Sequence, residues 1–284
     1  MSATLPSSRS ATYSPPIRAA TQRGRGLRTL ALSNAARLER MVEFRVMTWN
    51  LRGTGRPDLD EVAGRILAAH PDVVGIQEVR RGQAAKLASR LRWHHHWALK
   101  HFSYGPLTWL AEGMAVLSPH PMPLHTRTVL NPHARPWSYR RRIMQRAVLG
   151  GPHGPISIVN AHLASHQSHG ERARQAEVLA GEVRRNRDDN VITLVIGDLN
   201  AADEPTTLAP LEAAGLTDAW RISEDATTRT SSGFTNPAAR PQQRLDYVLV
   251  PDTLSVDGVD VPAGGDEWHR LSDHLPVIAR LRVR

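Results

Sequence analysis

From Phe44 onward the chain alternates between short apolar runs and amphipathic segments. Runs rich in Val, Ile, Leu and aromatic residues predict strands at 44–51, 73–76, 93–99, 113–118, 123–130, 143–149, 156–161, 191–197, 244–250 and 276–283. Apolar residues at helical spacing predict helices at 59–69, 84–91, 170–185 and 206–214, the first stopped by Pro71 and the last by Gly215. Many strands with few helices between them favour packed sheets with helices outside, in one domain without an internal repeat.

The first forty residues differ from the rest in composition. They are rich in Ser, Thr, Ala, Arg and Pro, and they carry +6 of the formal net charge of +9. Such a segment buries too little apolar surface to offset its ordering entropy. We therefore predict a disordered basic N-terminal extension over residues 1–40 and a single folded domain over residues 41–284. An organellar transit peptide is the alternative interpretation of the extension.

Composition excludes several classes of site. The chain has no cysteine, which rules out disulfides, thiolate metal sites and cysteine nucleophiles and suits a cytoplasmic protein. No apolar run approaches the roughly 20 residues of a membrane span. With only +3 outside the extension, the folded domain is not expected to grip DNA strongly. Basic and aromatic residues do not interleave in an obvious way for single-strand stacking. Arg140–Arg142 could contact phosphates or form a solvated turn.

Polar residues follow several of the predicted strands. Asn50 ends the first, Glu78 follows the second, and His162 follows the strand at 156–161. Each has an ordinary explanation by itself: a backbone hydrogen bond for Asn50, an arginine partner for Glu78, a structural histidine for His162. Asp198 and Asn200 lie two residues apart, so on an extended chain both side chains point to one side and could grip a water molecule.

A second group of polar residues stands near the C-terminus. Asp246 lies within a strand pattern, where a charge is unfavourable unless it is paired. His274, which follows Asp273, is a natural partner, since a carboxylate fixes the tautomer of an imidazole and raises its basicity. A site built from these oxygen and nitrogen donors, without thiolates, favours Mg²⁺ or Mn²⁺ over structural zinc.

Seven short phrases carry a family resemblance. In chain order they are MTWNL, GIQEV, EGMAVLS, NAHL, IGDLN, RLDYVLV and SDHLPV, and they extend from about residue 44 to the C-terminus. In this order the chain resembles the endonuclease/exonuclease/phosphatase superfamily, which includes pancreatic-type deoxyribonucleases, apurinic endonucleases and neutral sphingomyelinases. The resemblance implies an α/β (α+β) fold, a four-layer αββα sandwich with two packed mixed β-sheets and the site at one end of them.

The resemblance also implies a role for each polar residue. Glu78 would be the main ligand of a Mg²⁺ or Mn²⁺ ion, assisted by Asn50 and Asp273. Asp198, with Asn200, would orient or deprotonate the attacking water. His274 and His162 would stabilise the phosphate charge, with Asp246 polarising His274. Glu112 would orient His162.

These roles lead to an expected function. We expect a metal-dependent hydrolase that acts on P–O bonds, a monomer whose partner is a phosphate-ester substrate, with nucleic acid as the first candidate. The alternatives are a phosphatase or phosphodiesterase for small molecules or lipid headgroups, and a non-catalytic binding protein of the same fold.

Overall fold

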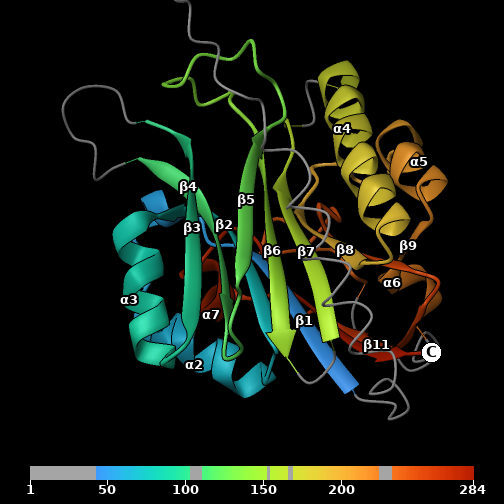
Figure 1. Cartoon of the computed structure of the whole chain (residues 1–284). Coiled ribbons are helices and arrows are strands. Elements are labelled where there is room, and N and C mark those ends of the chain that lie inside the picture. Colours follow the sequence, from blue (N-terminus) through green and yellow to red (C-terminus); the bar gives the residue numbers. More distant parts are fainter. Residues whose placement is uncertain (1–42, 103–110, 152–153, 166–168, 224–231) are drawn as a thin grey trace, which may run out of the picture.

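Two six-stranded β-sheets lie face to face, and helices cover their outer faces (Figure 1). The computed structural model describes residues 43–102, 111–151, 154–165, 169–223 and 232–284. The predicted extension over residues 1–40 lies outside the described residues. The αββα sandwich expected from the family resemblance is therefore confirmed.

Each sheet contains one parallel pair of strands near its centre. The first sheet has the order β11 (Leu254–Asp260), β12 (Val277–Val283), β1 (Glu43–Asn50), β2 (Val73–Arg80), β4 (Glu112–Ser118) and β3 (His94–His101). The second has the order β5 (Leu124–Val129), β6 (Ile143–Gly151), β7 (Gly154–His162), β8 (Ile192–Asp198), β10 (Asp246–Pro251) and β9 (Leu216–Asp218). The parallel pairs are β1 with β2 and β7 with β8, so their four carboxyl ends can share one edge of the sandwich.

Three apolar layers hold the sandwich together. The central layer packs Val46, Val73 and Val116 of the first sheet against Ile158 and Ile196 of the second. Helices α2 (Leu59–Ala69) and α3 (Arg81–Leu91) cover the outer face of the first sheet. Helices α4 (His169–Asp188) and α5 (Pro205–Ala213) cover the second. The connections also contain η2 (Gly53–Gly55), α6 (Ala219–Ile222) and α7 (Asp266–His269).

A buried polar contact joins the two sheets just below the strand ends. The side-chain amide of Gln77 on β2 donates to Asn160 on β7 over 2.7 Å, and both side chains are fully buried. Asn160 in turn donates to the carbonyls of Ile76 and Ala115 in the opposite sheet. Gly75 leaves room for this amide, because a Cβ there would lie 3.1 Å from both Cγ and Oδ1 of Asn160. The contact fixes how the ends of β2 and β7 face each other.

Most predicted elements agree with the structure to within a few residues. The helix at 59–69 matches α2, and the strand predicted at 73–76 continues to Arg80. Strands β9 and β11 were not predicted from the sequence. β9 has only three residues, and β11 mixes polar residues with valines and contains a register shift between Val256 and Gly258.

Candidate active site

Asp198, the last residue of β8, is the centre of a buried polar cluster. Its Oδ2 accepts a hydrogen bond from Asn50 Nδ2 over 3.0 Å and lies 3.5 Å from His162 Nε2 and 4.0 Å from His274 Nε2. Its Oδ1 accepts from the backbone N–H of Asn200 over 3.0 Å. The carboxylate is only 2% exposed. Residues from the ends of three strands, β1, β7 and β8, and from the segment before β12 therefore meet at Oδ2.

The strand register explains why these residues meet. In the parallel pair of β7 and β8, Asp198 lies opposite His162. In the antiparallel pair of β8 and β10, Asp198 lies opposite Asp246. Gly197 permits this arrangement, since its φ is 139° and a Cβ would lie 1.9 Å from the carbonyl oxygen of Ala161. Asn50 reaches Asp198 from the opposite sheet. Any side chain at position 197 would therefore clash with the neighbouring strand, which explains the glycine before Asp198.

His274 is held in place on three sides. Its Nδ1 lies 2.8 Å from Asp246 Oδ2, so the pairing expected from the sequence is present. Its backbone N–H donates to Ser272 Oγ, and its carbonyl accepts from Trp49 Nε1 over 2.9 Å. The Ser272 hydroxyl also donates to the carbonyl of Asn50. These contacts aim the free Nε2 of His274 towards Asp198.

Burial and neighbouring charges shift the pKa values of Asp198 and His274. Burial raises the pKa of Asp198 to about 7, although the neighbouring His274 cation opposes the shift. Burial favours neutral His274, but the carboxylates of Asp246 and Asp198 outweigh it and raise the pKa of His274 to about 10. At neutral pH His274 therefore carries a proton, and the pKa of Asp198 lies well above that of an exposed aspartate. A protonated imidazole thus lies beside a carboxylate with raised affinity for a proton.

His162 differs from His274 in charge. Burial, together with the nearby cations Lys100 and Arg142, lowers the pKa of His162 well below its usual value. The ring is therefore neutral at pH 7 and can donate one hydrogen bond but supply no charge. Its Nε2 lies 3.9 Å from Glu78 Oε1, and its Nδ1 is buried without a hydrogen-bond partner among the described residues.

Glu78 is placed by an irregularity in β2. The pairing of β2 with β4 shifts register between Ile76 and Val79, and Glu78 has a positive φ of 53°. A bulge of this kind redirects a side chain that a regular strand would leave in the pleat. Within the described residues, His162 is the one polar partner of the Glu78 carboxylate, which accepts no hydrogen bond. Burial and the nearby Glu112 carboxylate raise the pKa of Glu78.

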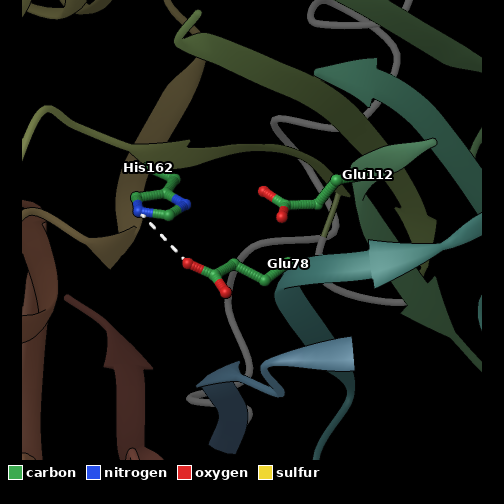
Figure 2. Close-up of side chains that lie close together, drawn as sticks. All are labelled: Glu78, Glu112 and His162. Atoms are coloured by element: carbon green, nitrogen blue, oxygen red, sulfur yellow. Dashed lines mark ion pairs between the residues drawn. The ribbon is translucent and has the colours of Figure 1, made fainter. Parts of the chain in front are cut away.

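Glu112 faces the same space but has a different partner. Figure 2 shows Glu78, Glu112 and His162 pointing towards one another, and one ligand atom from each lies within 4.8 Å of the others. Glu112 forms an ion pair with the ammonium group of Lys100, which is only 3% exposed, and makes no hydrogen bond to His162. Buried Lys100 requires a counter-ion. The expectation that Glu112 orients His162 is therefore not met.

Comparisons with known proteins identify the family of the chain. The family model described as Endonuclease/Exonuclease/phosphatase family matches residues 47–274, which contain every polar residue of the cluster. The chain belongs to this family. A comparison with curated proteins gives no match.

Solved structures of the family share the fold. An endonuclease/exonuclease/phosphatase from Beutenbergia cavernae is 24% identical, with a TM-score of 0.66 over 86% of this chain and 72% of that one. A mannosyl-6-phosphatase from Bacteroides thetaiotaomicron is 17% identical, with a TM-score of 0.68 over 84% and 99%. D. rerio TDP2 complexed with single strand DNA product is 16% identical, with a TM-score of 0.66 over 84% and 98%. At these identities the likeness concerns the fold alone.

One site residue, Asn200, lies differently from the sequence-based expectation, and Asp273 has a protein partner. The chain is not extended at Asn200, whose φ is 51°, so the two-residue spacing does not align its side chain with that of Asp198. Its amide donates instead to the carbonyl of Leu163 over 3.2 Å. Asp273 is already paired with Arg52 at 3.3 Å. Both residues border the cluster, but each has a protein partner.

Several buried residues support the site through contacts that the sequence did not indicate, and one of them, Arg142, was expected either to contact phosphates or to lie in a solvated turn. Arg142 Nε donates to the carbonyl of Leu163, next to His162, over 2.9 Å. Gln175 on α4 accepts from the backbone N–H of Ala164 over 2.8 Å, and buried Arg172 donates to the carbonyl of Ser165. These contacts hold the segment after His162. The signal available beforehand was weak, because arginine and glutamine are usually exposed.

Proposed function

We propose that the protein is a metal-dependent phosphodiesterase that cleaves a P–O bond by direct attack of water. The observation that carries this proposal is the environment of Asp198. A buried carboxylate with a pKa of about 7 lies 4.0 Å from the Nε2 of a histidine held protonated by a second carboxylate. One group is ready to take a proton, and the other is ready to give one.

The proton path follows from these positions. Asp198 would accept a proton from the attacking water as the water oxygen bonds to phosphorus, while Asn50 holds the carboxylate through its amide. The ester P–O bond would break, and His274 would give its proton to the leaving oxygen. Neutral His162 would donate a hydrogen bond to a phosphoryl oxygen. Phosphoryl transfer needs such positioning and charge neutralisation more than covalent help.

Glu78 fits a hard divalent cation. Its carboxylate is mostly buried, raised in pKa and without a hydrogen-bond donor among the described residues, so a bound cation would offset its desolvation. Asn50 and Asp273 are the further oxygen donors that we propose, with Mg²⁺ or Mn²⁺ as the ion. When bound, the ion would neutralise phosphate charge and polarise the phosphoryl oxygen. Asp273 would have to share its carboxylate with Arg52.

Nucleic acid is the first candidate substrate. The neighbours described above include one named as a phosphatase and one solved with a single-stranded DNA product, so the fold serves both kinds of ester. A small or lipid-headgroup phosphate ester is the alternative. No helix of the described residues is long and apolar enough to cross a membrane.

A substrate panel tests the proposal. The purified chain with Mg²⁺ or Mn²⁺ is assayed on bis-p-nitrophenyl phosphate, p-nitrophenyl phosphate, single-stranded and duplex DNA, an abasic duplex, sphingomyelin and inositol phosphates. We expect hydrolysis of diesters that stops in EDTA and in Asp198→Asn. Asp252→Asn, an exposed aspartate in the turn after β10, is the matched control and should keep full activity. Undiminished hydrolysis in excess chelator would contradict the proposal.

A further inference from the structure

A groove beside the active site combines aromatic and basic side chains. It has a volume of about 720 Å³ and lies between the connection from β5 to β6, residues 130–142, and the first turns of α4. Trp137, Arg135 and Arg140 line it, together with Arg174 of α4. Trp137 is 48% exposed, and Tyr139, in the same connection, is 57% exposed. Two large exposed aromatic side chains in one connection are unusual for a solvated turn.

Arginines lie over the rings of both aromatic residues. The guanidinium carbon of Arg135 is 5.6 Å from the ring centroid of Trp137, and that of Arg140 is 5.7 Å from the ring centroid of Tyr139. Basic and aromatic residues therefore interleave here, contrary to the expectation from the sequence. The interleaved residues occupy one short connection without regular secondary structure, so no periodic pattern in the sequence indicates them.

The groove is joined directly to the cluster around Asp198. The Arg142 guanidinium donates to the carbonyl of Tyr139 over 2.9 Å and, through Nε, to the carbonyl of Leu163, which follows His162. On the other wall, Gln175 lines the groove and accepts from the backbone N–H of Ala164. The same buried arginine therefore holds the aromatic connection and the strand end that carries His162. In Figure 1 this connection stands above the ends of β5 and β6, on the side where α4 begins.

The charge of the groove favours an anionic occupant. Arg135, Arg140 and Arg174 line it, and Glu171 is the one acidic residue among the described residues of its lining. Glu171 already accepts hydrogen bonds from the side chains of Asn131 and Gln175. The groove thus offers cations for phosphates and aromatic faces for flat rings. A polynucleotide supplies both, and only an unpaired base presents a free face for stacking.

We infer that this groove is a subsite for single-stranded nucleic acid, in which unpaired bases stack on Trp137 in the groove and on exposed Tyr139 of the same connection, while arginines contact the neighbouring phosphates. The inference rests on the proposed phosphodiesterase function and narrows its substrate to a single strand. A strand seated in the groove leads towards His162, so the phosphodiester at the Asp198 cluster lies a short distance along the same backbone.

Binding without turnover tests the inference. The full chain in excess EDTA is titrated into a fluorescein-labelled ten-nucleotide oligothymidine, its duplex with oligoadenine and phosphatidylserine-containing vesicles. We expect the single strand to bind at least about tenfold more tightly than the duplex. Trp137→Ala and Tyr139→Ala should each weaken single-strand binding about fivefold to tenfold, the usual effect of losing one stacked base. Trp137→Phe should retain most of the affinity.

Matched controls separate stacking from folding. Leu67→Ala removes an apolar side chain of similar exposure on α2, over the other sheet, and should leave binding unchanged. Because Trp137 and Tyr139 are exposed, thermal melting of their variants should match that of the wild type. Equal binding by wild type and Trp137→Ala, equal affinity for single strand and duplex, or binding to vesicles alone would each overturn the inference.

The two proposals can fail separately. Hydrolysis of bis-p-nitrophenyl phosphate with Mg²⁺, combined with no single-strand binding, would remove the groove inference and leave the phosphodiesterase. Single-strand binding that depends on the groove, combined with no hydrolysis of any ester, would remove the phosphodiesterase proposal and leave the groove as a binding site. If both hold, the ratio of kcat/KM on oligothymidine to that on bis-p-nitrophenyl phosphate should fall about fivefold to tenfold in Trp137→Ala.

Discussion

His274 Nδ1 lies 2.8 Å from Asp246 Oδ2, although 28 residues separate the two in the chain. Both side chains are buried, and Asp246 begins β10 while His274 precedes β12. The Oδ1 of Asp246 has no hydrogen-bond partner among the described residues, so the imidazole is the main compensation for this carboxylate. Each residue thus depends on the other, and the pair should behave as one unit.

A double-mutant cycle tests that unit. Asp246→Asn should reproduce much of the loss in His274→Ala, because the amide no longer holds the imidazolium. Each single change should lower kcat on bis-p-nitrophenyl phosphate about a hundredfold or more, the usual scale for a positioned proton donor. The double variant should be little worse than His274→Ala alone. Turnover rates of the four proteins at saturating Mg²⁺ decide the matter, and independent, multiplying losses would show that the pairing does not serve catalysis.

Metal binding should depend on Glu78 more than folding does. Glu78→Gln removes the charge that would hold the cation and also relieves an uncompensated carboxylate, so stability should stay equal or rise slightly. Mg²⁺ affinity, followed by calorimetry, should fall at least about tenfold. Glu177→Gln, which changes an exposed glutamate of α4, is the control. Equal affinity in Glu78→Gln would place the ion elsewhere.

The N-terminal extension should be dispensable. Residues 1–40 lack a core-forming pattern, and the family match begins at Met47. A chain that begins at Met41 should therefore melt within about a degree or two of the full chain. It should also keep its kcat and KM on bis-p-nitrophenyl phosphate. A large loss in either measurement would show that the extension contributes to the domain.

The sequence predicted the site residues best where polar side chains recur at the ends of apolar strands. Asn50, His162 and Asp198 end their strands as expected, and the pairing of Asp246 with His274 followed from the cost of a lone charge in a strand. Their roles in catalysis remain predictions. The sequence could not predict the bulge that redirects Glu78, because register depends on the partner strand.

The sequence also did not indicate contacts between residues that are far apart in the chain. Asn200 turns away from the expected direction through its left-handed backbone, and Arg142 finds a backbone carbonyl 21 residues later in the chain. No local pattern specifies such contacts. The aromatic groove was not predicted for a related reason, since Arg135, Trp137 and Arg140 lie outside regular elements, where periodicity gives no guide.

The last prediction concerns the buried ion pair between Lys100 and Glu112. Glu112→Gln leaves the buried ammonium without its main counter-ion and should lower the free energy of unfolding by about 3 kcal/mol at pH 7. Adding Lys100→Met removes the uncompensated charge and should recover much of the loss. Urea unfolding of the three proteins measures both effects, and a double variant no more stable than Glu112→Gln would contradict the pairing.

At low pH, the wild type and Glu112→Gln should have similar free energies of unfolding. Burial raises the pKa of Glu112, but the Lys100 cation, together with His101, outweighs it and lowers the pKa from 4.5 to about 2. A folded-state pKa below the unfolded value stabilises the protein above pH 4.5, and this contribution is lost as the pH falls towards 2. The stability gap between the two proteins should therefore shrink between pH 5 and pH 3, by roughly 1.4 kcal/mol per pH unit at most. A gap that stays constant over this interval would show that the Glu112 carboxylate does not compensate Lys100.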